Sequence, residues 1–236
     1  MSDDFPIRHL TVVGAGQMGA QIAVQAALHG FDVHLHDLDA AKLDAAMQEN
    51  RGHLERRVAK GKLSSEALDE AIARIVTTTD LERAAASADF VIEAVVELLD
   101  VKREVFAALD RFCPASAILA TNSSYLGASR LADATSRPEK VLTMHIFYPP
   151  LVMQLVEVVR HEATTDAAVE TTVELARRLG KTPVRVQKEL PGFLVNRILR
   201  ALANEAYALL DAGVATFEDI DLACKLGLNH PMGPFQ

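Results

Sequence analysis

Short apolar runs alternate with amphipathic stretches along most of the chain. The runs at 10–13, 32–36, 75–79, 90–94, 118–121 and 141–145 are rich in β-branched residues and leucine, which is typical of strands. Between them, apolar positions recur every three to four residues and predict helices after residue 17 and at about 40–60, 64–74, 80–88, 100–112 and 127–134. Strands that alternate with helices predict an α/β fold with a doubly wound, mostly parallel, Rossmann-like sheet.

The pattern changes after residue 145. Pro149 and Pro150 interrupt the alternation, a strand is expected at 154–159, a helix at 166–179 and a last strand at 183–186. From 193 to 212 the apolar spacing is helical throughout, and Thr216 is a suitable N-cap for another helix. We therefore expect one domain over residues 1–188 and the start of a second, smaller all-α domain over 189–236.

A glycine-rich turn follows the first predicted strand. Gly14, Gly16 and Gly19 have the G-x-G-x-x-G spacing, Gly30 closes the following helix, and Asp37 ends the second strand, 23 residues after Gly14. The first glycine permits a tight turn, the second lets the backbone approach a pyrophosphate, and the third lets the helix pack on the strand. An acid at the end of the second strand would accept a hydrogen bond from a ribose 2′-hydroxyl. This order predicts a dinucleotide site and favours NAD over NADP, while a tight turn without a ligand is the alternative.

His145 and Glu157 are the strongest candidates for proton transfer. Both residues are equally far from position 151, so a strand that folds back there would bring them face to face. A carboxylate on one ring nitrogen fixes the histidine tautomer, and the other nitrogen can then accept and return a proton near neutral pH. A structural histidine opposite an exposed glutamate explains the spacing equally well at this point.

Several further polar residues follow the strand ends, where ligands of such sheets bind. Asn122, Ser123 and Ser124 could bind a substrate oxygen or, alternatively, cap the next helix. Asn196 is an amide on an otherwise apolar helix, and Glu97 and Lys102 could be cofactor ligands or ordinary charges at a helix start. His34 and His36 share one face of a strand, but no further ligands lie near them in the sequence, so no metal site is expected.

Composition limits the possible partners. The 236 residues include 24 basic and 32 acidic side chains, giving a formal net charge of −8, which argues against nucleic acid and membrane surfaces as partners. No segment is long and apolar enough to span a bilayer, and no targeting signal is expected, so we predict a cytoplasmic protein. Cys113 and Cys224 are far apart, and we expect free thiols.

Taken together, these segments resemble the 3-hydroxyacyl-CoA dehydrogenase family. The matching segments cover nearly the whole chain in the family's order and are 14–19 with Asp37, 91–97 with 101–102, 122–124, 145–149, 155–158, 191–197 and 230–234. The resemblance implies NAD-dependent oxidation of an (S)-3-hydroxyacyl-CoA to the 3-oxoacyl-CoA, as in fatty acid β-oxidation, and a homodimer if the second domain is complete.

The resemblance also implies roles for individual residues. The catalytic histidine and its orienting glutamate fall on His145 and Glu157, and the substrate-binding residues on Ser124 and Asn196. The residues expected to bind the cofactor are Gly14, Gly16, Gln17, Met18, Gly19, Asp37, Glu97, Lys102, Asn122, Ser124 and Tyr148.

The chain departs from the family pattern at three places. Tyr148 stands where the family usually has asparagine, Tyr125 replaces a small residue beside the serine, and family members continue beyond the position of Gln236. Two phenols near the pocket suggest an unusual acyl group or altered activity, and we expect the second domain to be partial. The alternatives are a dehydrogenase of a free hydroxy acid or sugar acid, and a non-catalytic NAD-binding structural or sensor protein.

Overall fold

The computed structural model describes residues 5–236 and contains one eight-stranded sheet within that range. The strand order across the sheet is β3 (Ile75–Thr78), β2 (Asp32–His36), β1 (His9–Val13), β4 (Phe90–Glu93), β5 (Ile118–Thr121), β6 (Val141–Ile146), β7 (Leu155–Val159) and β8 (Thr182–Val186). Every neighbouring pair is parallel except β6 and β7, which are antiparallel. The predicted doubly wound, mostly parallel sheet is therefore confirmed.

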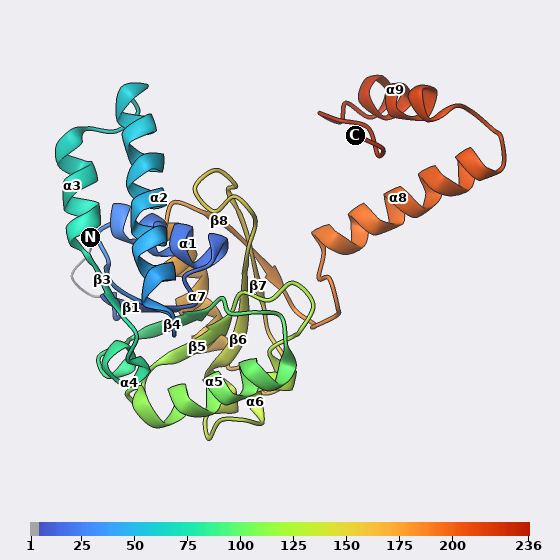
Figure 1. Ribbon diagram of the computed structural model, residues 1–236. Helices are drawn as coiled ribbons and strands as arrows, with labels where there is room; N and C mark the ends of the chain where they lie inside the picture. Colours follow the sequence, from blue (N-terminus) through green and yellow to red (C-terminus); the bar gives the residue numbers. More distant parts are fainter. Residues whose placement is uncertain (1–4) are drawn as a thin grey trace. The chain divides into compact units, whose positions relative to one another are not determined.

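Helices cover both faces of this sheet (Figure 1). One apolar cluster joins the sheet to α1 (Gln17–Leu28), α2 (Ala40–Ala59), α3 (Ser65–Ala73) and α7 (Asp166–Arg178). A second cluster on the opposite face includes α4 (Leu81–Ala85), α5 (Leu99–Phe112) and α6 (Ser129–Ala132), and the short 3₁₀ helix η1 (Pro138–Lys140) leads into β6. The predicted helices are all present, although α4 and α6 are shorter than the expected 80–88 and 127–134.

The residues at several helix ends and in the edge strand are those that these positions favour. The side chains of Asp39, Ser64 and Thr165 accept hydrogen bonds from the first turns of α2, α3 and α7, which is how N-caps stabilise a helix. Gly30 has the positive φ of 86° that favours glycine after a helix. Pro183 lies in β8, the outermost strand, where a residue without an N–H is tolerated.

Side-chain alternation along the strands places four polar residues on one face of the sheet. Leu119 and Val141 belong to the cluster with α5 and α6, so Thr121 and His145, two and four positions further on, lie on that same face. Glu93 is the register partner of Thr121, and Glu157 is the register partner of His145. Glu93, Thr121 and His145 sit at or near the ends of β4, β5 and β6, where the functional site was expected, and Glu157 lies opposite His145 in the middle of β7.

The chain divides into two compact units, Met1–Leu190 and Pro191–Gln236. The second unit contains α8 (Val195–Asp211) and α9 (Phe217–Gly227), and the predicted cap Thr216 accepts a hydrogen bond from the Asp219 N–H. Phe235 packs edge-to-face on Tyr207, with their ring centroids 5.0 Å apart, so the end of the chain returns to α8. Across residues 5–236, no helix is long and apolar enough to cross a membrane.

Candidate active site

The antiparallel pairing of β6 and β7 brings the predicted histidine and glutamate together. His145 is the register partner of Glu157, and its Nδ1 lies 2.7 Å from the Glu157 Oε2. Both side chains are buried, with 4% of His145 and none of Glu157 exposed. The fold-back expected from the sequence is confirmed, and the glutamate is not the exposed residue of the structural alternative. A buried carboxylate accepts the Nδ1 proton, which leaves Nε2 as the acceptor on the other side of the ring.

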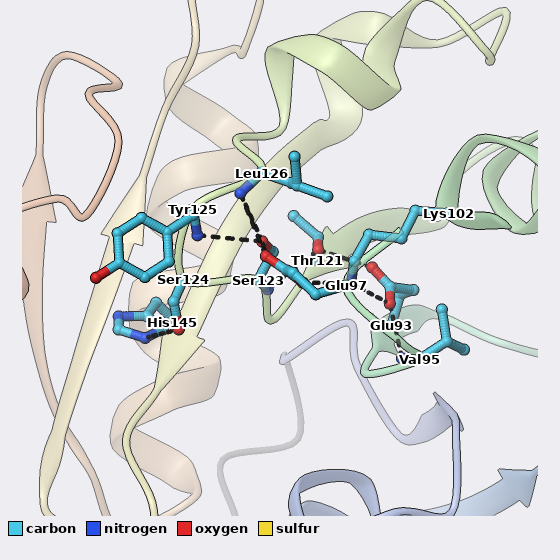
Figure 2. A network of polar contacts seen from close by, with 10 residues as sticks. All are labelled: Glu93, Val95, Glu97, Lys102, Thr121, Ser123, Ser124, Tyr125, Leu126 and His145. Carbon is cyan, nitrogen blue, oxygen red and sulfur yellow. Dashed lines mark hydrogen bonds and ion pairs between the residues drawn. The ribbon is translucent and has the colours of Figure 1, made fainter. Parts of the chain in front are cut away.

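A hydroxyl group lies at that second nitrogen. Ser124 follows β5, and its Oγ is 3.0 Å from the His145 Nε2, as Figure 2 shows. Ser124 is half-buried, so this end of the chain of three side chains is the one nearer to solvent. The arrangement hydroxyl–imidazole–carboxylate can transfer a proton at Nε2 while Glu157 stabilises the charged ring.

The neighbours of Ser124 hold its loop and do not cap the next helix. Helix α6 begins after Ala128 without a side-chain cap, so the capping alternative for residues 122–124 is wrong. Asn122 Oδ1 accepts a hydrogen bond of 2.9 Å from the Ile146 N–H, which ties the end of β5 to β6. Ser123 Oγ instead accepts a hydrogen bond of 2.8 Å from the Leu126 N–H within the turn.

A buried ion-pair network lies next to this turn (Figure 2). Lys102 Nζ is 2.7 Å from Glu93 Oε1 and 3.2 Å from Glu97 Oε2, and 1% of the lysine side chain is exposed. Burial alone would raise the pKa of Glu97, but the hydrogen bond from Ser123 and the charge of Lys102 outweigh it and lower the pKa. Glu97 is exposed and ionised, whereas Lys102 contacts carboxylates and lies away from solvent.

The glycine turn has the shape that a pyrophosphate needs. Gly14 has a φ of 107°, and a Cβ there would lie 2.5 Å from the Ala94 carbonyl oxygen, while a Cβ on Gly19 would collide with the Gly14 carbonyl. A Cβ on Gly16 would meet nothing within 4 Å, and Gly16 has no side chain to cap α1. The open space and the uncapped helix start lie together, as an anion site at a helix N-terminus requires.

Asp37 also lies beside this turn. Its Oδ2 accepts a hydrogen bond of 2.9 Å from the Ala15 N–H, so the carboxylate is held next to the glycines. Gln17, at the start of α1, is exposed, and Met18 is half-buried. These residues fit a dinucleotide: the turn and α1 would hold the phosphates, and Asp37 the adenosine ribose. Across residues 5–236, no cluster of three potential ligands could hold a metal ion.

Substitution of two glycines separates folding from cofactor binding. Gly16→Ala should leave the melting temperature nearly unchanged, because its Cβ enters open space, but should weaken NADH binding by about tenfold or more by occupying the phosphate approach. Gly14→Ala should instead lower stability by roughly 1–3 kcal/mol, because φ is positive and the Cβ meets Ala94. Thermal unfolding and NADH fluorescence titration measure both effects. Gly61→Ala, a positive-φ glycine in open space outside the motif, is the control; equal NADH affinity in Gly16→Ala and the wild type would contradict the assignment.

Sequence reasoning did not identify Glu93 or Thr121. Their signal was a carboxylate and a hydroxyl closing otherwise apolar strands, but only the pairing of β4 with β5 shows that they meet.

Tyr125 and Tyr148 are 46% and 57% exposed, and Figure 2 shows the Tyr125 ring on the same side of the loop as the His145 imidazole. Asn196 lies in α8 of the second unit, where it is half-buried.

Comparison with known proteins decides the family. Residues 9–190 match the family model "3-hydroxyacyl-CoA dehydrogenase, NAD binding domain", and residues 192–236 match the C-terminal domain model of the same family. The chain belongs to the 3-hydroxyacyl-CoA dehydrogenase family. It is an NAD-dependent oxidoreductase, and the predicted enzyme class and cofactor are confirmed.

Three relatives illustrate the likeness. A 3-hydroxybutyryl-CoA dehydrogenase of Bradyrhizobium diazoefficiens is 44% identical over 230 residues, which cover 98% of this chain and 78% of that protein. The crystal structure of an (S)-3-hydroxybutyryl-CoA dehydrogenase from Ralstonia eutropha superposes with a TM-score of 0.93 at 38% identity, covering 97% of this chain and 80% of the other. A diketoreductase described as acting on dicarbonyl compounds superposes with a TM-score of 0.90 at 37% identity, over 97% of this chain and 81% of the other.

Proposed function

We propose that His145 is the general base and acid of this dehydrogenase and that Glu157 orients it. His145 Nε2 takes the proton of the substrate 3-hydroxyl as the 3-oxo group forms, and it returns that proton in the reverse direction. Glu157 keeps the Nδ1 proton in place and stabilises the imidazolium across the 2.7 Å contact. NAD supplies the acceptor for the hydride that leaves C3 of the substrate.

Ser124 marks where the reacting oxygen binds. Its hydroxyl lies 3.0 Å from the His145 Nε2, so an oxygen atom that accepts a hydrogen bond from Ser124 is within reach of the base. The substrate hydroxyl would thereby be held at the nitrogen that accepts its proton. We assign Asn196, which is half-buried in α8, to binding the thioester region of the substrate by resemblance.

The main support for this function is the position of the Ser124–His145–Glu157 chain in the sheet. The Ser124–His145–Glu157 chain begins just after β5, passes through the end of β6 and finishes in the antiparallel strand β7, on the face of the sheet that also carries Glu93 and Thr121. In doubly wound sheets, ligands bind outside the carboxyl ends of the strands. A proton-transfer group at that place, in a sheet whose first turn fits a dinucleotide, supports hydride transfer coupled to proton transfer.

We propose a short 3-hydroxyacyl-CoA as the substrate, because Tyr125 stands beside Ser124 and its ring lies toward His145. The rate of NADH oxidation with acetoacetyl-CoA should exceed that with longer 3-oxoacyl-CoA homologues. Tyr125→Ser should raise kcat/KM for the longer homologues by about tenfold, the scale of a few buried methylenes, and leave acetoacetyl-CoA nearly unaffected. Tyr207→Ser, in the second unit, is the matched control; an unaltered chain-length profile in Tyr125→Ser would contradict this role.

A second candidate is a reductase of free oxo acids or dicarbonyl compounds, for which the similarity to the diketoreductase is the specific reason. Turnover of free acetoacetate at the same kcat/KM as acetoacetyl-CoA would favour this candidate. Preference for the thioester by more than about tenfold would favour the acyl-CoA substrate, since the CoA moiety then contributes binding energy.

A further inference from the structure

Glu93 is a fully buried carboxylate that the proposed mechanism does not use. Its Oε1 accepts hydrogen bonds of 2.7 Å from both the Val95 N–H and Lys102 Nζ, and its Oε2 accepts one of 2.7 Å from Thr121 Oγ1. A buried ion pair of this kind contributes little net stability compared with apolar packing, because both charges lose their hydration. We therefore expect Glu93 to contribute mainly by holding its hydrogen-bond partners in position.

Lys102 connects Glu93 to Glu97, which lies in the exposed loop after β4. Its ammonium group lies between Glu93 at 2.7 Å and Glu97 at 3.2 Å, with almost no contact with solvent. On one side the lysine contacts the fully buried carboxylate of Glu93, and on the other side it contacts the exposed carboxylate of Glu97. The position of Glu97 thus depends on a charge that Glu93 keeps in place.

Glu97 in turn fixes the turn that contains Ser124. Its Oε1 accepts hydrogen bonds from the Ser123 hydroxyl and, at 3.3 Å, from the Leu126 N–H. Ser123 Oγ accepts hydrogen bonds from the N–H groups of Leu126 at 2.8 Å and Tyr125 at 3.3 Å. Because Glu97 takes the proton of the Ser123 hydroxyl, the lone pairs of that oxygen remain directed at the turn. Ser124 sits between these anchored residues, as Figure 2 shows.

We propose that Glu93 is a positioning residue that acts through Lys102 and Glu97 to hold Ser124 against His145. The contacts run from the end of β4 through α5 and two loops to the imidazole, and each joins side chains of the first unit. This inference rests on the proposed roles of His145 and Ser124. It explains why a carboxylate occupies the last position of an otherwise apolar strand.

Hydrogen exchange of the cofactor-free protein tests the first half of this inference without any turnover. Glu93→Gln keeps the side-chain shape and removes the charge that holds Lys102. Amide exchange at residues 124–126 should become about tenfold faster, although Glu93 contacts none of these residues, because the anchoring network loosens. The Ser123 N–H is left out of the readout because it donates to Thr121 Oγ1, which itself donates to Glu93. Lys102→Met should give the same change. Glu104→Gln, on the exposed side of α5, is the control and should leave the exchange of this turn unaltered.

A double-mutant cycle tests the link to catalysis. Glu93→Gln alone and Ser123→Ala alone should each lower kcat/KM by about tenfold, and Glu93→Gln should have less than a twofold further effect once Ser123 is alanine. Additive losses, or faster exchange confined to 94–98, would overturn the proposal and leave Glu93 as a support of its own loop. Retained turnover in His145→Ala would instead refute the proposed function, and the exchange data on the turn would still report the coupling by themselves.

Discussion

Replacing His145 with alanine should lower kcat by about 10²–10⁴-fold, the range that a positioned general base contributes. The reason is that Nε2 is the nitrogen that can take a proton, since Glu157 holds Nδ1 at 2.7 Å. NADH affinity should remain close to that of the wild type, because the glycine turn and Asp37 that fit the dinucleotide lie at β1 and β2. Steady-state reduction of acetoacetyl-CoA and an NADH fluorescence titration measure the two quantities.

The control for this prediction is His53→Ala. His53 lies on α2, where it contacts Arg56 and Glu49, so its loss changes a surface helix and no part of the site. Wild-type kcat in His53→Ala, with a large loss in His145→Ala, would locate the effect at the imidazole on β6. Turnover of His145→Ala within about threefold of the wild type would remove the basis for general base catalysis by this residue.

The sequence predicted the dyad because its geometry is local. Two strands that pair antiparallel about position 151 place His145 opposite Glu157, independently of the order of the other strands. The glycine turn was predictable for a similar reason, because Gly19 packs against the Gly14 carbonyl within one strand–turn–helix unit. Both features need residue types and spacing, and neither needs the strand order.

The network around Glu93 could not be predicted in the same way. Glu93 meets Thr121 only because β4 and β5 are neighbours in register, and Glu97 meets Ser123 only because the loops after these strands leave on the same side. These contacts join residues 26 to 28 positions apart. Ser123 and Ser124 show why such contacts are hard to predict. Their position before a predicted helix suggested that they cap it, but Ser123 Oγ accepts a hydrogen bond from the Leu126 N–H in the turn that precedes α6.

The site combines these two kinds of contact. Short-range geometry creates the proton-transfer pair His145–Glu157, and the pairing of β4, β5 and β6 brings Ser124 to the remaining nitrogen. Asn122 links the latter two strands directly through the Ile146 N–H, next to His145. A change in the loop after β5 therefore reaches the imidazole from the backbone side through Asn122 and from the side-chain side through Ser124.

Glu157→Gln should have the second large effect, a loss of roughly 10²–10⁴-fold in kcat, because an amide in this place can favour the wrong histidine tautomer. Glutamine has nearly the same shape, but its NH₂ group can donate to Nδ1, which moves the ring proton to Nε2 and blocks the base. The variant should fold, since an amide replaces a carboxylate without leaving a cavity. Its pH–rate profile should also move, because the charge that stabilises the imidazolium is lost.

Turnover in the direction of hydroxyl oxidation, measured from about pH 6 to about pH 10, tests this expectation against two matched variants. Glu157→Asp keeps the charge on a shorter side chain and should recover part of the rate, which a purely structural role of Glu157 does not explain. Glu162→Gln removes an exposed carboxylate just beyond β7 and should behave as the wild type. A Glu157→Gln enzyme with an unaltered pH–rate profile would mean that His145 transfers its proton without help from the carboxylate beside it.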